Sequence, residues 1–290
     1  VWLASMFAAL SLMASGIGQA AEWTILVYLD GDNNLHYAGL DDMAEMQQVG
    51  SDANVNVVVQ WDGYAGYGDG NGGTARYYIR PGQRQLVQDL GELNMGSPQT
   101  LIDFVKWGMD SYPANHYAVV LWNHGDGWRS RARTRAPQSG GGSGAYPPYK
   151  AIAWDDSNGG DALYMNEVRT ALAQIQTQRQ APDLLGFDAC LMGMAEVAYE
   201  IQPYASVMVA SEESEPNEGW PYNTILQDLA ATPTMGAAEL GGTIVNRYGQ
   251  FFASQSNCTM SALDLTTVSS VAAALDTFAD AMMSGWDPQI

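Results

Sequence analysis

The fold of this chain follows from one stretch, Asp183-Leu184-Leu185-Gly186-Phe187-Asp188-Ala189-Cys190-Leu191-Met192-Gly193. Its crowded apolar side chains are typical of a strand that is covered on both faces. A helical pattern follows, so Cys190 is predicted to lie at the carboxyl end of a strand and near the start of a helix. Open α/β sheets place reactive groups at that end, and a helix amino terminus favours a thiolate. Two other interpretations stay open: a small buried side chain, or a disulfide with Cys258.

A second apolar stretch, 117–123, also reads as a buried strand, and it ends at His124 and Gly125. The chain has three histidines, and only His124 lies between an apolar strand and a glycine-rich turn. Two buried strands that end in a cysteine and a histidine fit a thiol nucleophile with a nearby general base. A glycine after the histidine would let a backbone N–H approach a substrate carbonyl. A single histidine at a strand end is more often structural, so the argument depends on the pair.

The blocks Trp122-Asn123-His124-Gly125 and Asp188-Ala189-Cys190-Leu191-Met192 resemble those of the clostripain-type cysteine peptidases, which share a clan with caspases, legumain and gingipains. The stretches 28–35 and 209–213 match the same family, and the resemblance extends from about Trp23 into the 260s. It implies a caspase-like three-layer α/β sandwich, a preference for Arg or Lys before the cut, and processing of the chain between His124 and Cys190.

The order of elements independently predicts a mostly parallel sheet with helices on both faces, because strands alternate with helices along the chain. We expect strands over 23–30, 54–61, 74–80, 85–90, 117–123, 151–154, 184–188, 206–210 and 259–265. We expect helices over 35–49, 97–112, 165–178, 193–204, 222–231, 235–254 and 267–284. The strands that end at His124, Cys190 and Glu212 would then open onto one edge of the sheet, which predicts an active site there.

Residues 1–20 carry no charge, and an apolar run over 2–13 is followed by the small-residue stretch Gly18-Gln19-Ala20. This pattern predicts a signal peptide, export to a secreted or periplasmic location, and no membrane attachment after cleavage. A membrane anchor is the alternative, although the run is short for a spanning helix. We expect residues 21–290 to form the peptidase domain, with the basic start of the signal missing before Val1 and a truncated C-terminus after Ile290.

The chain is strongly acidic, with 32 Asp and Glu against 12 Lys and Arg and a net charge of −20. Nucleic acid is therefore not expected as a partner, because phosphate backbones need basic patches. Protein or peptide substrates with basic residues suit an acidic surface. Solubility explains the bulk charge equally well.

The connection 126–150 is rich in Gly and Pro and is predicted to be a mobile linker. It holds five of the twelve basic residues, which are Arg129, Arg131, Arg133, Arg135 and Lys150. Either it is a solvated linker, or it contains a site that the enzyme itself cuts. The second interpretation agrees with the processing that the family resemblance implies.

A pocket for a basic side chain needs carboxylates. Asp188 is the best candidate, because it lies two residues before Cys190 and on the same strand face. A second carboxylate is expected from 212–218, and we assign Glu212, Glu213 and Glu218 to substrate binding. The alternative for these glutamates is a solvated charged loop.

The chemistry of a thiol and a histidine requires no cofactor, and metal ligands stay unassigned. Asp30, Asp32 and Asn34 have the alternate spacing of a calcium loop, but Leu35 stands where such a loop requires glycine. Capping of a turn is the better interpretation. The acidic turn 155–161 can also hold a cation, so calcium binding stays open.

Together these features predict a secreted cysteine endopeptidase that cleaves after basic residues and processes itself within 129–150. Cys190 is the expected nucleophile, His124 the proton-transfer group, and the N–H groups of Gly125 and Cys190 the expected oxyanion hole. Two alternatives remain: an exported binding domain without activity, and another thiol enzyme such as an amidase or transpeptidase.

Overall fold

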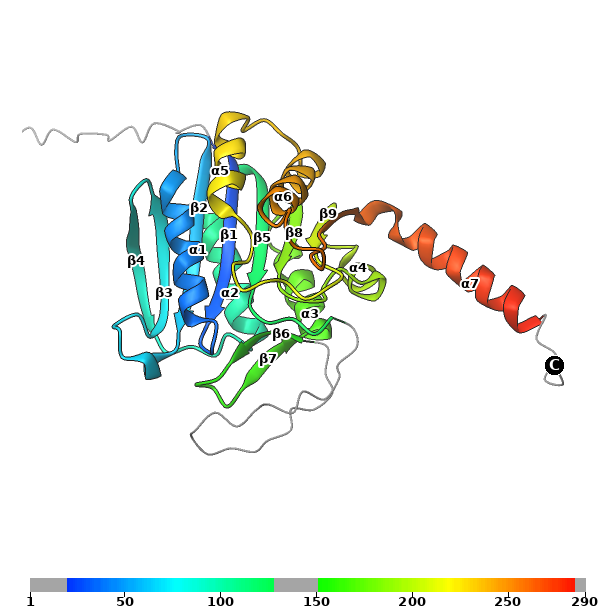
Figure 1. Ribbon diagram of the computed structural model, residues 1–290, viewed down its shortest axis with the longest axis horizontal. Coiled ribbons are helices and arrows are strands. Elements are labelled where there is room, and N and C mark those ends of the chain that lie inside the picture. The colour runs from blue at the N-terminus through cyan, green and yellow to red at the C-terminus, as the bar shows by residue number, and fades with distance from the viewer. Residues whose placement is uncertain (1–19, 128–150, 285–290) are drawn as a thin grey trace, which may run out of the picture.

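The computed structural model describes residues 20–127 and 151–284, which form one central sheet with helices around it (Figure 1). The sheet has eight strands in the order β10-β9-β8-β5-β1-β2-β3-β4. Its strands are β1 (Ala21–Gly31), β2 (Val55–Gly63), β3 (Gly73–Arg80), β4 (Gln83–Gly91), β5 (Ala114–Trp122), β8 (Leu184–Asp188), β9 (Val207–Ala210) and β10 (Ser261–Asp264).

The five central strands run parallel, and β3, β4 and β10 are antiparallel additions at the two edges. In β1, Leu26 and Tyr28 contribute to one buried core, whereas Val27 and Leu29 contribute to the other. Alternate residues of a strand point to opposite faces, so this strand is covered on both sides. Its apolar sequence is therefore needed along its whole length.

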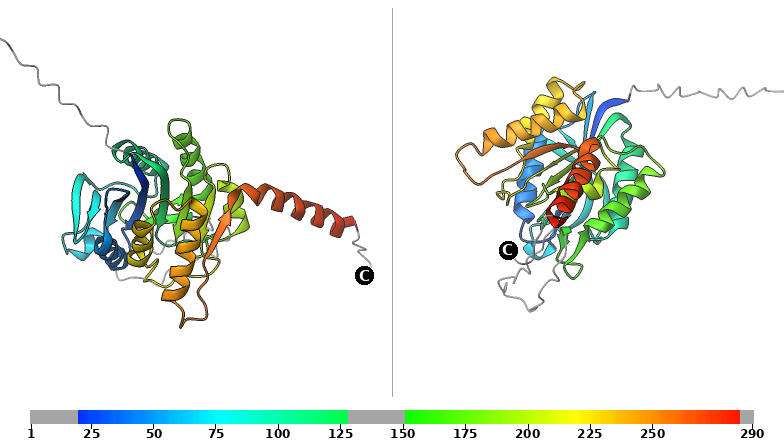
Figure 2. Two further views of the ribbon diagram at one scale, coloured as in Figure 1. Left: turned by 90° about the horizontal axis from the view of Figure 1, so that it is seen from above. Right: turned by 90° about the vertical axis from the view of Figure 1, so that its right-hand side faces the viewer.

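Helices cover both faces of the sheet (Figure 2). On one face, α1 (His36–Val49), α5 (Tyr222–Ala231) and α6 (Ala237–Phe251) supply apolar residues to the core that contains Val27. On the other face, α2 (Pro98–Ser111), α3 (Met165–Gln176) and α4 (Ala195–Ile201) pack on the core that contains Leu26. The predicted three-layer α/β fold with a mostly parallel sheet is confirmed.

A two-stranded hairpin and one helix lie outside these three layers. A small hairpin of β6 (Ala151–Asp155) and β7 (Asp161–Tyr164) lies at the edge where β1 and β5 end (Figure 1). The helix α7 (Val268–Ser284) projects away from the body (Figure 2). Among the described residues, no helix is long and apolar enough to cross a membrane.

Most predicted elements form within a few residues of their expected bounds. The prediction missed β7, because four residues between an acidic turn and a helix carry little strand signal. The expected helix over 193–204 is shorter and begins at Ala195, five residues after Cys190. The proposed signal peptide falls almost entirely outside the described residues, as do Arg129, Arg131, Arg133, Arg135 and Lys150 of the linker.

The register between β5 and β8 decides where the predicted site residues lie. These neighbouring strands are parallel, and Trp122 pairs with Asp188 at their carboxyl ends. His124 and Cys190 each follow two residues after this pair. Two segments that are far apart in the sequence therefore deliver an imidazole and a thiol to the same edge at the same level.

Candidate active site

Cys190 and His124 line one cavity at the carboxyl edge of the sheet, next to the ends of β5 and β8. Its other lining residues are Leu35, Trp122, Asn123, Asp188, Ala189, Glu215, Pro216, Asn217 and Gly219. The cavity is narrow, with a volume of about 40 Å³. Both cysteines are free thiols, so the disulfide between Cys190 and Cys258 is wrong.

His124 is held by two asparagines. Its backbone N–H donates to the side-chain oxygen of Asn123, and Asn123 Nδ2 donates to the Asp30 carbonyl at 2.7 Å. The ring atom His124 Nε2 lies 2.9 Å from Asn34 Oδ1. A carbonyl oxygen only accepts, so the proton of the neutral ring is on Nε2 and the lone pair is on Nδ1. Asn34 therefore selects the tautomer in which Nδ1 is the basic nitrogen.

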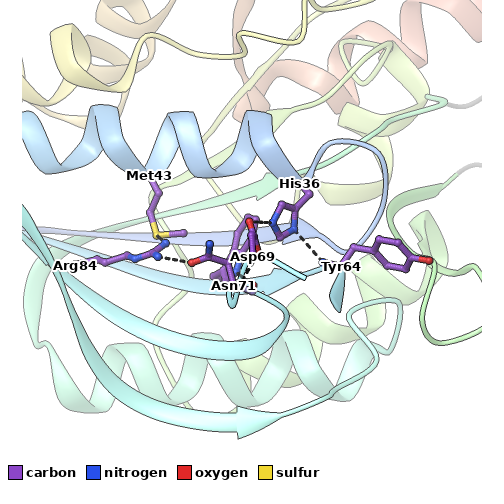
Figure 3. A network of polar contacts seen from close by, with 7 residues as sticks. His36, Met43, Tyr64, Asp69, Asn71 and Arg84 are labelled. Carbon is purple, nitrogen blue, oxygen red and sulfur yellow. Dashed lines mark hydrogen bonds and ion pairs between the residues drawn. The ribbon is translucent and has the colours of Figure 1, made fainter. Parts of the chain in front are cut away.

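The other two histidines have structural contacts. Figure 3 shows His36 between two parts of the 64–71 loop: Nε2 lies 3.0 Å from Asp69, and Nδ1 accepts a hydrogen bond from Tyr64 N–H at 3.1 Å. His36 is fully buried and adjoins Leu35, so these contacts fix the start of α1 beside the cavity. His116 pairs with Asp183 at 3.1 Å.

Backbone atoms of the 211–219 segment contact the sulfur of Cys190. The Glu215 N–H donates to Sγ at 3.3 Å, and Sγ lies 3.9 Å from the Glu215 carbonyl oxygen. Cys190 does not lie next to a helix amino terminus, as the sequence predicted, because α4 begins five residues later. The helix dipole acts only over about one turn and therefore does not reach the thiol. Leu191 has φ +64, so the chain turns sharply directly after the thiol.

Gly125 packs directly against the backbone of the Cys190 turn. A Cβ at position 125 would lie 2.4 Å from the carbonyl oxygen of Cys190 and 3.0 Å from Ala189 Cβ. No side chain larger than hydrogen fits there without a shift of one backbone segment. The main chains at Gly125 and Cys190 are thus neighbours, as two N–H groups must be if they are to bind one oxygen.

Asp188 is buried at the cavity and is held by hydrogen bonds. Its Oδ2 accepts from Tyr222 Oη at 2.9 Å and from Trp220 N–H at 3.3 Å. Burial raises the pKa of Asp188 to about 6, and these two donors lower it by favouring the charged form. A carboxylate is therefore fixed beside the cavity, two residues before the thiol.

Two further buried carboxyl groups lie beside Asp188. A Cβ at Gly219 would lie 3.1 Å from Asp42 Oδ2 and 3.2 Å from each Asp188 oxygen. The carboxyl groups of Asp42 and Asp188 therefore both lie against Gly219. Both carboxylate oxygens of Glu215 are inaccessible to solvent, and the carboxyl group lies against Asp188 and the backbone of Ala189. Burial and then the charge of Asp188 raise the pKa values of Asp42 and Glu215 well above their ordinary values.

No Lys, Arg or His in the described part of the chain forms an ion pair with Asp42, Asp188 or Glu215. Asp188 and Glu215 line the cavity, and Asp42 lies beside Asp188; we call these three residues the acidic group of the cavity. Buried carboxylates are costly without a cation or a proton. The arrangement is therefore suited to a cation that arrives with a ligand.

The structure does not bring Glu212, Glu213 and Glu218 to the cavity. All three are exposed, and Glu212 accepts a hydrogen bond from Ser261 on β10. The glutamate that lines the cavity is Glu215, within the same predicted segment 212–218. Sequence reasoning also missed Asn34 and Asp42, because both belong to elements that precede the histidine and cysteine blocks and meet them only in the fold.

A second acidic cluster lies beyond the cavity, near the ends of β1, β2 and β4. Asp32, Asp62, Glu92 and Asp155 each offer a carboxylate oxygen within 4.8 Å of the others. Among the described residues, this is the set that can hold a metal ion. Asp32 and Asp155 come from the two stretches in which the sequence suggested a cation. In the structure they belong to one cluster and not to two separate loops.

A thiol and an imidazole that follow adjacent parallel strands at one sheet edge are typical of caspase-like cysteine peptidases. The family model described as the clostripain family matches residues 27–289. The chain belongs to the clostripain family. Clostripain of Hathewaya histolytica is 32% identical over 237 residues, which span 72% of this chain and 42% of that protein.

Two solved structures share the fold. One is a secreted C11 cysteine protease from Bacteroides thetaiotaomicron in complex with an irreversible peptide inhibitor, with a TM-score of 0.68 at 23% identity. The match spans 88% of this chain and 69% of that protein. The other is an inactive zymogen C11 protease from Parabacteroides distasonis, with a TM-score of 0.66 at 23% identity, where 89% of this chain covers 66% of that protein.

Proposed function

We propose that this protein is a secreted cysteine endopeptidase that cleaves peptide bonds after arginine or lysine. The observation that carries the proposal is the single cavity lined by Cys190, His124, Asp188 and Glu215. A nucleophile, a proton-transfer group and buried negative charge meet there. Membership of the clostripain family supports the peptidase chemistry.

In the proposed reaction, Cys190 Sγ attacks the carbonyl carbon of the scissile bond and forms a thioester as the C–N bond breaks. His124 transfers the thiol proton to the leaving amine through Nδ1, while Asn34 holds Nε2. The N–H groups of Gly125 and Cys190 stabilise the oxyanion. Water then hydrolyses the thioester, with His124 as the base.

The acidic group of the cavity supplies the specificity in this proposal. The guanidinium or ammonium group of the substrate enters next to Asp188 and Glu215 and provides the positive charge that this buried group lacks. The cavity of about 40 Å³ is too small for such a side chain. Binding therefore requires the 211–219 segment, whose backbone contacts Cys190 Sγ, to move away from the sulfur.

Maturation and location complete the proposal. The enzyme cuts its own linker within 129–150, after one of the residues Arg129, Arg131, Arg133, Arg135 or Lys150. It is exported, to a secreted or periplasmic location, with residues 1–20 as its signal peptide. The Bacteroides thetaiotaomicron protease that shares this fold is itself secreted, which supports this location.

Peptide hydrolysis by a cysteine and a histidine needs no cofactor for the chemistry. We place any calcium outside the chemical steps. The residues suited to calcium are the four carboxylates near the ends of β1, β2 and β4, whereas the acidic group of the cavity is reserved for the substrate.

The test is labelling with two peptidyl chloromethyl ketones that differ only in their last residue, arginine or norleucine. The arginine reagent should label Cys190 and inactivate the protein, and the norleucine reagent should react at least about tenfold more slowly, because it lacks the charge. Cys190→Ala should lower hydrolysis by about ten-thousandfold or more, with Cys258→Ala as the matched control of unchanged activity.

The same experiment separates the alternatives. A folded wild type that reacts with neither reagent is a binding domain without activity. Labelling of Cys190 without any cleavage of peptide bonds indicates another thiol enzyme, such as an amidase or transpeptidase. Labelling and loss of activity that follow Cys258 would refute the assignment of the nucleophile.

A further inference from the structure

We propose that Tyr37, Tyr64 and Tyr67 form a second substrate-binding surface, which holds an aromatic side chain on the carboxyl-terminal side of the cut bond. These residues, here called the tyrosine patch, are 52%, 37% and 40% exposed. The inference rests on the proposed peptidase function and adds a second contact to it, remote from the acidic group of the cavity. Single exposed aromatic residues are common, whereas a contiguous set of them marks an interaction surface.

The three rings of the patch are in contact with one another. The ring centroids of Tyr37 and Tyr67 lie 4.9 Å apart, and those of Tyr64 and Tyr67 lie 5.6 Å apart in an edge-to-face arrangement. Tyr37 belongs to the first turn of α1, whereas Tyr64 and Tyr67 come from the loop that follows β2. Two separate segments therefore build one continuous aromatic surface.

His36 supports all three tyrosines from inside the protein. The centroid of its fully buried ring lies 5.2 Å from that of Tyr37 and 5.0 Å from that of Tyr67. The same ring accepts a hydrogen bond from the Tyr64 N–H and contacts Asp69, so one imidazole ties the loop to the start of α1 (Figure 3). Rings that are fixed before binding lose little conformational entropy in a complex, which favours recognition.

The glycine-rich loop that carries Tyr64 is also anchored at its far end. Trp61 Nε1 donates to the Asn71 carbonyl at 2.8 Å, and the Asn71 N–H donates to Asp69 at 2.9 Å. Within the loop, Gly66 packs against the Tyr64 ring, where a Cβ would lie 2.4 Å from a ring carbon. The loop is therefore held at both ends, although its glycine content alone is typical of a flexible segment.

The tyrosine patch lies beside the active-site cavity. Leu35 lines that cavity, and Asn34 Oδ1 lies 2.9 Å from His124 Nε2. Tyr37 follows two residues after Leu35, so their Cα atoms are at most about 7 Å apart. A peptide that occupies the cavity can therefore extend onto the patch.

The order of the strands indicates which side of the cut bond faces the patch. The strands β8, β5, β1 and β2 are neighbours in this order, and they are followed by Cys190, His124, Asn34 and Tyr64. In the proposed reaction the leaving amine takes its proton from His124, so the chain after the cut leaves the thiol in the direction of β5. The same direction leads past β1 to the tyrosines.

The spacing of the strands gives the position of the side chain that is bound. Neighbouring strands lie about 4.8 Å apart, and an extended peptide advances about 3.3 Å per residue. The distance from the end of β8 to the end of β2 thus corresponds to about four residues. We expect the second, third or fourth residue after the cut to contact the patch.

The chemistry of the patch favours an aromatic side chain. Tyrosine rings offer flat apolar faces and edges for offset or edge-to-face contacts with another ring. Asp69 is the carboxylate next to the patch, and it is already bonded to His36 and to the Asn71 N–H. The patch therefore differs in kind from the acidic group of the cavity, which is suited to a basic side chain.

The test measures binding and not turnover, with full-length Cys190→Ala protein and short peptides that contain one arginine. Phenylalanine at the second, third or fourth residue after the arginine is compared with alanine at the same place. At one of these positions phenylalanine should lower the Kd by about three- to tenfold. Adding Tyr37→Ala should abolish this gain, whereas Tyr37→Phe keeps the ring and should retain it.

Tyr199→Ala is the matched control, because Tyr199 is 53% exposed and lies on α4, which covers the other face of the sheet. It should keep the full gain from phenylalanine. If Tyr37→Ala does not fold, Tyr64→Ala takes its place with the same expected loss.

Three results would overturn the inference: no gain from phenylalanine after the arginine, an equal gain when phenylalanine precedes the arginine, or a gain that survives both Tyr37→Ala and Tyr64→Ala. Replacing the arginine by norleucine tests the proposed specificity separately. A gain from phenylalanine without any preference for arginine would refute that specificity and leave the tyrosine patch in place. A preference for arginine without a gain from phenylalanine would do the reverse.

Discussion

At the scale of single residues, the tautomer of His124 depends on Asn34. Its Oδ1 lies 2.9 Å from His124 Nε2 and keeps the proton there, so that Nδ1 can act on the thiol and the leaving amine. Asn34 does not contact the reacting atoms in the proposed reaction. It is a positioning residue that acts through the histidine.

Replacing Asn34 by alanine should lower kcat by about 10- to 100-fold and leave KM within about threefold, because only the alignment of the ring is lost. Asn34→Asp keeps an acceptor at Nε2 and should retain most of kcat, while its negative charge moves the pH profile of kcat upward. The exposed Asn115→Ala is the control. Equal losses for Asn34→Ala and Asn34→Asp would indicate that Asn34 serves only the fold of the loop.

Glu215 lines the cavity at the proposed specificity site, whereas the sequence predicted other glutamates of the same segment there. Glu215→Gln removes a buried carboxylate that has no cation partner in the described chain, so kcat/KM for arginine substrates should fall by about tenfold or more. Glu213→Gln is the matched control on the same segment, since Glu213 is exposed and should change kcat/KM by less than twofold. Activity that depends on Glu213 and not on Glu215 would reverse this assignment.

Binding of basic side chains should depend on pH through Asp188. Burial raises the pKa of Asp188 to about 6, so the residue goes from about one-tenth ionised at pH 5 to about nine-tenths at pH 7. A cation binds the ionised form. The Kd of an arginine-ended peptide for Cys190→Ala protein should therefore fall by about tenfold between pH 5 and pH 7. A norleucine-ended peptide should show no such change, and a flat profile for arginine would contradict the assignment.

The raised pKa of Asp188 also makes the stability of the unliganded protein depend on pH. The pKa of Asp188 is higher in the folded state than the ordinary value near 3.8, so the folded state binds more protons between these two values. Stability should therefore decrease as the pH rises from about 4 to 6. A bound basic side chain would offset that loss, because it supplies the missing charge.

At the scale of elements, the site depends on the close contact between the turn after β5 and the turn after β8. Gly125→Ala would put a Cβ 2.4 Å from the Cys190 carbonyl oxygen. We expect kcat/KM to fall by about 100-fold, because a backbone shift of about 1 Å displaces the proposed oxyanion donors, and the Tm to fall by a few degrees.

The control is Gly242→Ala on α6, where an added Cβ meets nothing within 4 Å. That change should leave the kinetics unaltered and slightly stabilise the helix. If Gly125→Ala had wild-type kinetics, the contact between the two turns would not define the oxyanion site.

At the scale of the whole molecule, the linker joins two parts that contribute neighbouring strands to one sheet. β5 comes from the part before the linker and β8 from the part after it, and they pair directly. A cut within 129–150 should therefore leave the two chains associated. The wild type should give two bands on a denaturing gel and a single peak of the intact size in gel filtration.

Mass spectrometry should find the new carboxyl terminus at Arg or Lys within 129–150, and Cys190→Ala should stay as one chain. Adding a trace of wild type to Cys190→Ala tests whether one molecule can cut another. A fully active wild type that is never cut would disprove the maturation step and leave the proposed catalytic pair unaffected.

The sequence by itself determined the elements and the two halves of the site. Apolar runs such as 117–123 are typical of strands that are buried on both faces, and parallel strands present their carboxyl ends at one edge. Cys190, His124 and Asp188 follow from these local patterns because each stands at or near the end of such a strand. The family blocks around them added the type of chemistry.

Only the tertiary structure decided which residues complete the site. Asn34 reaches His124 because β1 lies beside β5. Glu215, and none of the other glutamates of the 211–219 segment, lines the cavity because of how that segment crosses Cys190. Four segments must also converge to bring together the carboxylates of Asp32, Asp62, Glu92 and Asp155. Contacts between residues far apart in the chain depend on strand order and loop path, which short sequence patterns do not encode.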